Sequence, residues 1–481
     1  MATIQDFYSG RSVFLTGASG FLGKQVLEKL LRSCNVKNVY VLVRPKKGKT
    51  SQERKEELLK SKLFSTLKIT KPHFSSQVIL IAGEMTSPGM GLSEEDERTL
   101  REDVSVVIHS AASVNFMEKL RDAVVVNVIA LREMLKFAKT LTKLESFVHI
   151  STAYVNCHKQ FSPECIVKPL HDPHAIIAML KNNTDEALEA QAQQLIRPWP
   201  NTYTFTKCLA EWLLQEEMGN LPVCIFRPSI IGASAEEPFR GWVDNFNAAT
   251  GVCVGTGTGI LTNIYGDQNM KADIVPVDYC ANAIIALGWS TAIERSSKLP
   301  VFNFTSGQLN PVKWADFVYW IPTYFNQCPL EACTGYSTPS FSTNRLRYLL
   351  YVYGKDRVKM IFLDFLLRLK GKTPRLVRLH QRALKGSGVL EFFTSNEWNF
   401  ESENIAAFIE KISAEDRMTF NFDIKTVKWA EYLIHYCEGI KEYAMKESMS
   451  LSSIERARKT QNRFAQQPRS YPGTDDFLYP G

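Results

Sequence analysis

The sequence lacks the features that would assign it to a specialised class of protein. Among its 481 residues, no apolar stretch approaches the ~20 residues of a membrane-spanning helix; apolar runs such as 123–126 and 128–131 are interrupted by Asn127 and Arg132. It has no repeats and no low-complexity segment, which excludes solenoid and fibrous architectures. The first strand-like run starts at residue 12, so we expect no signal peptide.

The net charge and the cysteine spacing are also typical of an ordinary globular protein. Lysine and arginine number 57 and acidic residues 50, a formal charge of +7. This small excess argues against a nucleic-acid-binding protein and is compatible with an anionic cofactor and substrate. The ten cysteines form no Cys-x-x-Cys motif, and several lie in apolar runs such as 223–226. We therefore predict buried free thiols in a reducing compartment, without a disulfide framework or a metal site.

The pattern of apolar residues predicts an α/β protein. Hydrophobic residues make up 45% of the chain, and its length exceeds one ordinary core, so two lobes are expected. Strand-like and helix-like runs alternate in the first half, as a doubly wound parallel sheet requires. The predicted strands are Ser12–Leu15, Asn38–Val43, Val78–Ala82, Val104–Ile108, Phe147–Ile150 and Val223–Phe226. From about residue 341 the pattern is mainly helical.

A glycine-rich turn opens the first predicted helix. The run Thr16-Gly17-Ala18-Ser19-Gly20-Phe21-Leu22-Gly23 links the first strand to a helical pattern over residues 21–31. Gly17 permits the sharp turn, Gly20 lets the backbone approach a pyrophosphate, and Gly23 allows close packing of helix and strand. The positive end of the helix would meet the pyrophosphate. Such a triplet alone is common, but here it predicts a Rossmann-type dinucleotide-binding start.

A second motif supplies the chemistry. Tyr203 and Lys207 are one helical turn apart, so a phenol and an ammonium share one face. A carbonyl reduced by hydride develops negative charge that Tyr203 can protonate, and we expect Lys207 to lower the pKa of Tyr203. Ser151 or Thr152, just beyond the fifth strand, can hydrogen-bond the same oxygen; the alternative for each is a turn cap.

The end of the second predicted strand bears on cofactor choice. Arg44 stands there, followed by Lys46 and Lys47, and a basic residue at this place accommodates a 2′-phosphate. NADPH is therefore expected, with solvated surface charge as the alternative. Glu84 is placed near the adenine, and Ala111 and Ala112 leave room beside the cofactor. His109 is expected to be structural.

The segment 355–385 combines basic and apolar residues. Lys355, Arg357 and Lys359 precede apolar runs that end at Leu367, and five further basic residues follow between 368 and 378. Such a segment can contact a membrane surface or the phosphates of a long-tailed substrate. An ordinary helix packed on a core is the third alternative.

These motifs and several others resemble one family, the animal alcohol-forming fatty acyl-CoA reductases. They are extended short-chain dehydrogenases with a helical C-terminal domain. The likeness runs from about residue 5 to about residue 450. The matching stretches are Leu15–Lys24, Tyr40–Arg44, His149–Tyr154, Tyr203–Lys207, Arg227–Ser234, Gly241–Asn247, Asp273–Asp278, Glu391–Trp398 and Trp429–Tyr432.

The resemblance implies reduction of a long-chain acyl-CoA to a primary alcohol in two NADPH-dependent steps, for wax or ether-lipid synthesis. Tyr203, Lys207 and Ser151 or Thr152 would be the catalytic set. The expected cofactor-binding residues are Thr16, Gly17, Ser19, Gly20, Phe21, Gly23, Arg44, Glu84, Ala111, Ala112, Lys207 and Pro228. An aldehyde-forming reductase and a catalytically silent paralogue that binds NADPH or lipid remain alternatives.

The expected organisation is an NADPH-binding domain over 1–285, a connecting acyl-site region over 286–344, a helical domain over 345–446 and a polar, disordered tail over 447–481. The resemblance implies a peroxisomal location, although relatives end in a hydrophobic anchor where this sequence is polar; the alternative is the cytoplasm. Gly83-Glu84-Met85 stands where the family usually has an Asp-containing turn, and Asn115 where an arginine is frequent.

Overall fold

The computed structural model describes residues 2–45, 48–296 and 298–463. The chain packs into two units, and each draws on three separate segments. The first unit holds the residues up to Ile231, then Val275–Leu309 and Trp398–Lys425. The second holds Gly232–Ile274, Asn310–Glu397 and the described residues from Thr426 onward. The ranges expected from the sequence are consecutive, whereas these units interleave along the chain.

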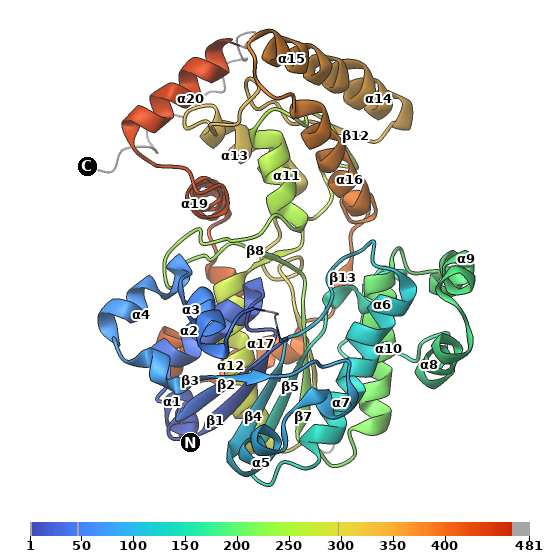
Figure 1. Cartoon of the computed structure of the whole chain (residues 1–481), viewed down its shortest axis with the longest axis vertical. Helices are drawn as coiled ribbons and strands as arrows, with labels where there is room; N and C mark the ends of the chain where they lie inside the picture. Colours follow the sequence, from blue (N-terminus) through green and yellow to red (C-terminus); the bar gives the residue numbers. More distant parts are fainter. Residues whose placement is uncertain (1, 46–47, 297, 464–481) are drawn as a thin grey trace. The chain divides into compact units, whose positions relative to one another are not determined.

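The first unit is built on a seven-stranded parallel sheet, which confirms the predicted fold class (Figure 1). Its strand order is β11-β7-β5-β4-β1-β2-β3. The bounds are β1 Ser12–Thr16, β2 Asn38–Val43, β3 Val78–Ala82, β4 Val104–His109, β5 Ser146–Ile150, β7 Val223–Pro228 and β11 Val301–Phe304. The central strands β1, β4, β5 and β7 are buried along their whole length, as expected for a sheet covered on both faces.

Helices cover both faces of this sheet. Figure 1 shows α10 and α7 on one side and α2 and α12 on the other, and α12 packs on α2 and on β5. The helices of this unit are α1 Ile4–Tyr8, α2 Phe21–Ser33, α3 Ser51–Leu59, α4 Ser65–Thr70, α5 Glu94–Asp103, α6 Leu120–Val124, α7 Ala130–Ala138, α8 Pro173–Asn182, α9 Asp185–Ile196, α10 Thr202–Glu217, α12 Val277–Glu294, α17 Glu403–Lys411 and α18 Ala414–Thr419. A π-type turn, Val125–Ile129, joins α6 to α7. Short 3₁₀ turns span Lys62–Phe64, Phe74–Gln77, Pro88–Gly91, Ala153–Asn156 and Ile424–Thr426.

Helix α10 is fixed to the sheet by a buried ion pair. Asn201 caps its start by accepting a hydrogen bond from the Thr204 backbone N–H (2.9 Å). Further along, Glu211 receives two hydrogen bonds from the Arg227 guanidinium of β7 (2.8 and 2.6 Å). The remaining Arg227 donors go to the backbone oxygens of Pro163 and Cys165, both 2.9 Å away, and to the Asn303 side-chain oxygen (3.5 Å). Because the pair is buried and satisfied on all sides, it holds α10 in one position.

The C-terminal segment Trp398–Lys425 completes the first unit. Its strand β13 (Asn399–Phe400) pairs in parallel with β6 (Phe161–Ser162). The Glu164 carboxylate accepts from the backbone N–H groups of Asn303 (2.8 Å) and Asn404 (2.6 Å). The Asp416 carboxylate accepts from the Ile4 backbone N–H at the start of α1 (3.0 Å). Residues 412 positions apart are thus joined in one core.

The second unit is mainly helical. Its helices are α11 Ala248–Gly257, α13 Trp314–Phe325, α14 Arg345–Leu349, α15 Arg357–Leu369, α16 Leu376–Thr394, α19 Trp429–Gly439 and α20 Leu451–Arg463. π-type turns at Leu350–Asp356 and Ile440–Ala444 continue α14 into α15 and extend α19. Short strands β9 (Ile264–Tyr265) and β12 (Phe341–Ser342) pair in parallel. Strands β8 (Ile230–Gly232) and β10 (Ile274–Pro276), which pair with each other, belong mostly to the first unit. Helix α13 packs between α11 and α19.

Two features differ from the sequence-based expectation. The seventh strand, β11, was not expected, because Val301–Phe304 is short and lies where the alternation of patterns fades. Within the expected polar tail, Leu451–Arg463 forms α20, whose Ser453 and Ala457 are buried; residues 464–481 lie outside the described part. Of the helices in the described part, none has the length and apolar content that a bilayer crossing demands.

In the second unit, α19 crosses the loop at Gly241 with no room for a side chain. A Cβ atom at Gly439 would overlap the backbone oxygen of Gly241, and one at Gly241 would overlap the backbone of His435. Gly241 also has a positive φ of +74°, which other residues rarely adopt. Backbone-to-backbone contact therefore requires glycine at both positions.

We expect Gly439→Ala to lower the free energy of unfolding by about 3 kcal/mol, because backbone atoms cannot yield as a side chain can. Gly386→Ala is the matched control: Gly386 lies within α16, and no atom comes within 4 Å of its added Cβ. That variant should gain about 1 kcal/mol from helix propensity. Urea unfolding measures both; similar midpoints for the two variants would contradict the close contact.

Candidate active site

The predicted site residues gather at the carboxyl ends of neighbouring strands. Gly17 follows β1, Ala111 lies beyond β4, Thr152 lies beyond β5, and Pro228 ends β7. These four strands are adjacent in the order β7-β5-β4-β1. Chain order reverses between β1 and β4, which is the switch point where ligands bind in open α/β sheets.

The glycine turn is as tight as the spacing predicts. At Gly17, φ is +74°, and an added Cβ would lie 2.7 Å from the Ala111 backbone nitrogen. An added Cβ at Gly23 would overlap the Gly17 backbone. Gly20 occupies the N-cap position of α2, so no side chain stands over the first turn, and Ser19 is exposed beside it. This backbone shape fits a pyrophosphate at the helix N-terminus.

Thr16 has structural partners within this turn. Its buried hydroxyl hydrogen-bonds His109 Nδ1 (3.0 Å) and accepts from the Ala111 backbone N–H (3.2 Å). The His109 ring stacks on His149 with 5.4 Å between centroids. Burial lowers the pKa of His109 to about 3 and that of His149 well below its usual value, so both rings are neutral. His109 therefore ties β4 to β1 and β5, which is the expected structural role.

Tyr203 and Thr152 are neighbours, and the Thr152 hydroxyl lowers the pKa of the Tyr203 phenol. The same hydroxyl accepts from the Tyr154 backbone N–H (3.3 Å), as the cap of the turn Ala153–Asn156, and lies 3.5 Å from the Pro228 backbone oxygen. One turn further along α10, the buried Lys207 ammonium donates to the Ile150 backbone oxygen (2.8 Å) at the end of β5. The predicted phenol, hydroxyl and ammonium thus lie together over the carboxyl end of β5.

The pKa of Tyr203 differs from the expectation. Burial raises it to about 12, and the neighbouring Thr152 hydroxyl acts in the opposite direction. Lys207 does not lower it; burial instead lowers the pKa of Lys207 to about 8, opposed by the charge of Glu211. Sequence spacing correctly placed the two groups on one face but could not reveal how strongly both are desolvated.

Between the two predicted hydroxyls, the geometry favours Thr152. The buried Ser151 hydroxyl has no hydrogen-bond partner within the described part of the chain, and its backbone N–H donates to the Phe226 oxygen (2.8 Å). The sequence did not point to Phe116, whose ring stacks on Tyr203 with 5.5 Å between centroids. Phe116 lies in the loop after β4, five residues beyond Ala111, and that proximity to a predicted cofactor residue was the available signal.

Arg44 and Glu84, both assigned to the cofactor, form an ion pair. Arg44 Nε lies 3.0 Å from Glu84 Oε2, just beyond the adjacent strands β2 and β3. The Arg44 side chain is 64% exposed, so solvent reaches the pair. The guanidinium can meet an incoming anion, but it already carries a carboxylate partner. The two lysines predicted to assist, Lys46 and Lys47, lie outside the described residues.

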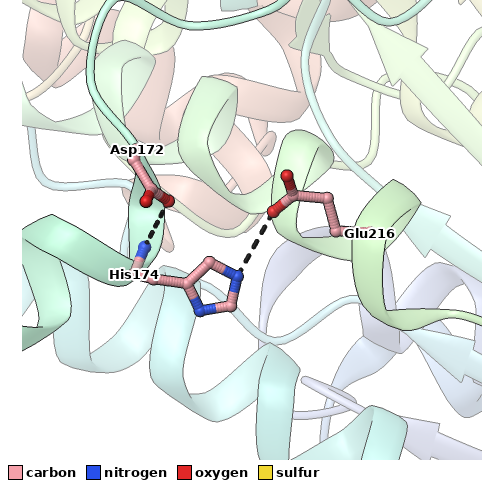
Figure 2. A group of neighbouring side chains, drawn as sticks. All are labelled: Asp172, His174 and Glu216. Atoms are coloured by element: carbon pink, nitrogen blue, oxygen red, sulfur yellow. Dashed lines mark hydrogen bonds and ion pairs between the residues drawn. The ribbon is translucent and has the colours of Figure 1, made fainter.

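One group of metal-type ligands occurs on the surface of the first unit, within the described residues. Figure 2 shows His174 of α8 between Asp172, which accepts from the His174 backbone N–H (2.9 Å), and Glu216 of α10, 3.3 Å from Nε2. Arg132 approaches the other ring nitrogen (2.6 Å) and pairs with Glu217 (2.9 Å). The guanidinium would repel a cation, so we assign this group to surface ion pairing between α8 and α10.

Two family profiles match the chain, and both are described as male sterility protein. One is an NAD-binding profile that covers residues 15–284, and the other covers residues 356–447. Human fatty acyl-CoA reductase 1 is 41% identical over 464 residues, which span 96% of this chain and 90% of that protein. Human fatty acyl-CoA reductase 2 is 38% identical over 451 residues, 94% of this chain and 88% of that protein.

Solved structures agree on the fold. A reductase domain of a nonribosomal peptide synthetase from Mycobacterium tuberculosis superposes with a TM-score of 0.60 at 21% identity, covering 90% of this chain and 92% of that one. The terminal reductase domain of the myxalamid pathway gives a TM-score of 0.57 at 19% identity, covering 90% of each chain. The match to the NAD-binding profile indicates an oxidoreductase that uses a nicotinamide cofactor. The matches to the fatty acyl-CoA reductases are long and similar enough to assign the family. This chain belongs to the fatty acyl-CoA reductase family.

Proposed function

We propose that this protein reduces long-chain fatty acyl-CoA thioesters to primary alcohols with two equivalents of NADPH. The observation that carries the proposal is the placement of the Thr152 hydroxyl beside the Tyr203 phenol over the end of β5, with Lys207 one turn away. The names of the 41%-identical relatives supply the substrate class. We further propose that the alcohols serve wax or ether-lipid synthesis, in peroxisomes.

The residues of the site can supply the proton that each reduction requires. The cofactor, when bound, supplies hydride to the carbonyl carbon. Tyr203 then donates its proton to the developing alkoxide, a far stronger base than a phenolate, so a pKa of about 12 suffices. Thr152 hydrogen-bonds the same oxygen and fixes the carbonyl beside the phenol. Lys207, held on Ile150, keeps a positive charge beneath the reacting groups.

Two rounds of this chemistry lead to the alcohol. Addition of hydride and a proton to the thioester gives a hemithioacetal, which expels CoA as a thiol and leaves an aldehyde. A second hydride and proton convert the aldehyde to the alcohol. The same Tyr203 and Thr152 can act in both rounds, because the thioester in the first round and the aldehyde in the second each place a carbonyl oxygen at the same position. Overall, two NADPH and two protons are consumed for each acyl-CoA.

The experiment that tests the proposal incubates the purified full chain with palmitoyl- or stearoyl-CoA and NADPH. We expect a fatty alcohol as the product and two NADPH oxidised for each CoA released, measured by chromatography and absorbance. One NADPH per CoA with aldehyde as the product would identify an aldehyde-forming reductase. Absence of turnover with bound NADPH would identify a silent, cofactor-binding protein.

Tyr203→Phe serves as the control for the catalytic assignment. It removes the proton donor and keeps the ring that stacks on Phe116, so we expect the rate to fall about 10²–10⁴-fold with little change in folding. Ser151→Ala is the matched comparison and should keep most of the activity. Equal product from wild type and Tyr203→Phe would refute the assignment.

Cofactor choice is tested at the Arg44–Glu84 pair. Arg44→Ala should raise KM for NADPH about tenfold, because a charge-assisted contact with the 2′-phosphate is lost from an exposed site. Glu84→Gln should lower it, since Arg44 would no longer share its charge with a carboxylate. NADH kinetics in the same variants are the control and should barely move. An equal change for both cofactors would contradict the role of Arg44.

The pKa of Lys207 predicts the pH dependence. Burial favours the neutral amine, so the ammonium of the free enzyme loses its proton near pH 8 instead of near its usual value. We therefore expect kcat/KM to fall as the pH rises above about 8, by up to about tenfold per pH unit. Steady-state profiles from pH 6 to about 11 measure it. An alkaline limb only above pH 10 would show that Lys207 is not the titrating group.

A further inference from the structure

The helix that runs from α14 through α15 exposes a continuous row of large apolar side chains. We call this row the α14–α15 face. Of the 19 large hydrophobic side chains exposed in the described part of the chain, nine lie within residues 346–369. Val358, Ile361, Phe362, Phe365 and Leu369 are each more than half exposed. The other members are Leu346, Leu349, Leu350 and Tyr353.

Helical geometry places this row on one side. Exposed apolar positions recur every three or four residues from 346 to 353 and again from 358 to 369. The five-residue step from Tyr353 to Val358 spans the π-type turn Leu350–Asp356, whose wider turn takes up the extra residue. Figure 1 shows α14 and α15 following one another as one long helix. The apolar face is thus continuous along its length.

The opposite side of the same helix is anchored within the second unit. Tyr348 and Val352 belong to a buried cluster with Val252, Leu261 and Ile264. The Asp356 carboxylate accepts from the Thr262 backbone N–H (2.9 Å) and hydroxyl (2.7 Å). Met360 and Leu363 are buried on the same side. The α14–α15 face is therefore presented by a helix that is fixed in place.

Basic residues surround the apolar row. Residues 345–390 contain twelve lysines and arginines and two acidic residues, a formal charge of +10 against +7 for the whole chain. Both acids, Asp356 and Asp364, are buried; the Asp364 carboxylate accepts from three backbone N–H groups at the start of α16 (2.9, 2.9 and 3.0 Å). Neither carboxylate within the segment is exposed, and Glu391, just beyond its end, pairs with Arg345 alone among the described residues (2.6 Å).

We propose that the α14–α15 face lies in the interfacial layer of a bilayer with anionic lipids. An apolar face flanked by lysine and arginine is the pattern of a helix that lies in the plane of the interface. Phosphate and carboxylate headgroups complement the charge of +10. A second copy of the chain is disfavoured as the occupant, because a two-fold contact would bring two such faces together and oppose like charges. The proposal is independent of the reductase activity.

The test is flotation of the full chain with vesicles of phosphatidylcholine, with and without phosphatidylserine. We expect binding to the phosphatidylserine vesicles and at least about tenfold weaker binding to phosphatidylcholine alone. Raising NaCl from about 0.1 M to about 1 M should release the protein, since the Debye length falls from about 10 Å to about 3 Å. Neither acyl-CoA nor NADPH is present, so failure here is distinct from failure of the proposed function.

The apolar variant is Ile361→Gln with Phe362→Gln and Phe365→Gln. It should bind phosphatidylserine vesicles at least about tenfold more weakly than wild type and unfold at the same temperature. The matched control replaces three exposed apolar residues elsewhere, Ile69, Leu170 and Met418, by glutamine and should bind as wild type does. Sedimentation of both variants gives their oligomeric state.

Three outcomes would overturn the proposal. The first is equal vesicle binding by wild type and the apolar variant. The second is loss of binding by the control triple variant as well, which would indicate a general effect of surface polarity. The third is a wild-type protein that is a dimer and does not bind vesicles, together with an apolar variant that is a monomer. That result would mean that a second copy of the chain covers the α14–α15 face.

Discussion

The active-site geometry depends on one buried ion pair, between Glu211 of α10 and Arg227 of β7. Tyr203, Lys207 and Glu211 stand four residues apart on one helical face, and each is attached to the sheet through a different partner. Tyr203 meets Thr152, Lys207 meets the Ile150 oxygen, and Glu211 meets Arg227. Separating Arg227 from Glu211 would leave an unpaired charge buried in the unit, which would lower the stability of the fold strongly. The part of α10 around Glu211 is therefore fixed, and so is the position of the Tyr203 phenol near the N-terminus of the same helix.

The sequence predicted the parts of this arrangement that depend on local patterns. Asn38–Val43 and Val78–Ala82 are strands with the expected bounds, and the helix after the glycine turn begins at Phe21 as expected. The sharp turn at Gly17, with its positive φ of 74°, also follows from its residue type and place. These features could be predicted because a buried parallel strand and a glycine turn each leave a signature within a few residues.

Other features depend on contacts that no short window contains. Val301–Phe304 becomes a strand because it pairs with β7, and Phe116 matters because a loop carries it onto Tyr203. The pKa values of Tyr203 and Lys207 reflect burial by atoms from several elements, so the spacing of the pair could not give their direction. Likewise, the basic and apolar composition of 355–385 was evident, but which of its side chains face outward depended on the π-type turn before α15.

The return of Trp398–Lys425 to the first unit bears on how the chain folds during synthesis. Its residues supply the Asp416 carboxylate that accepts from Ile4 and the Trp398 ring that packs edge-on against Tyr154. The reductase core therefore stays incomplete until residue 425 has left the ribosome. A nascent chain that stops between the two profile matches would expose the edge of β6 and the Glu164 carboxylate to water. Maturation of the cofactor-binding half is thus tied to synthesis of the half that follows it.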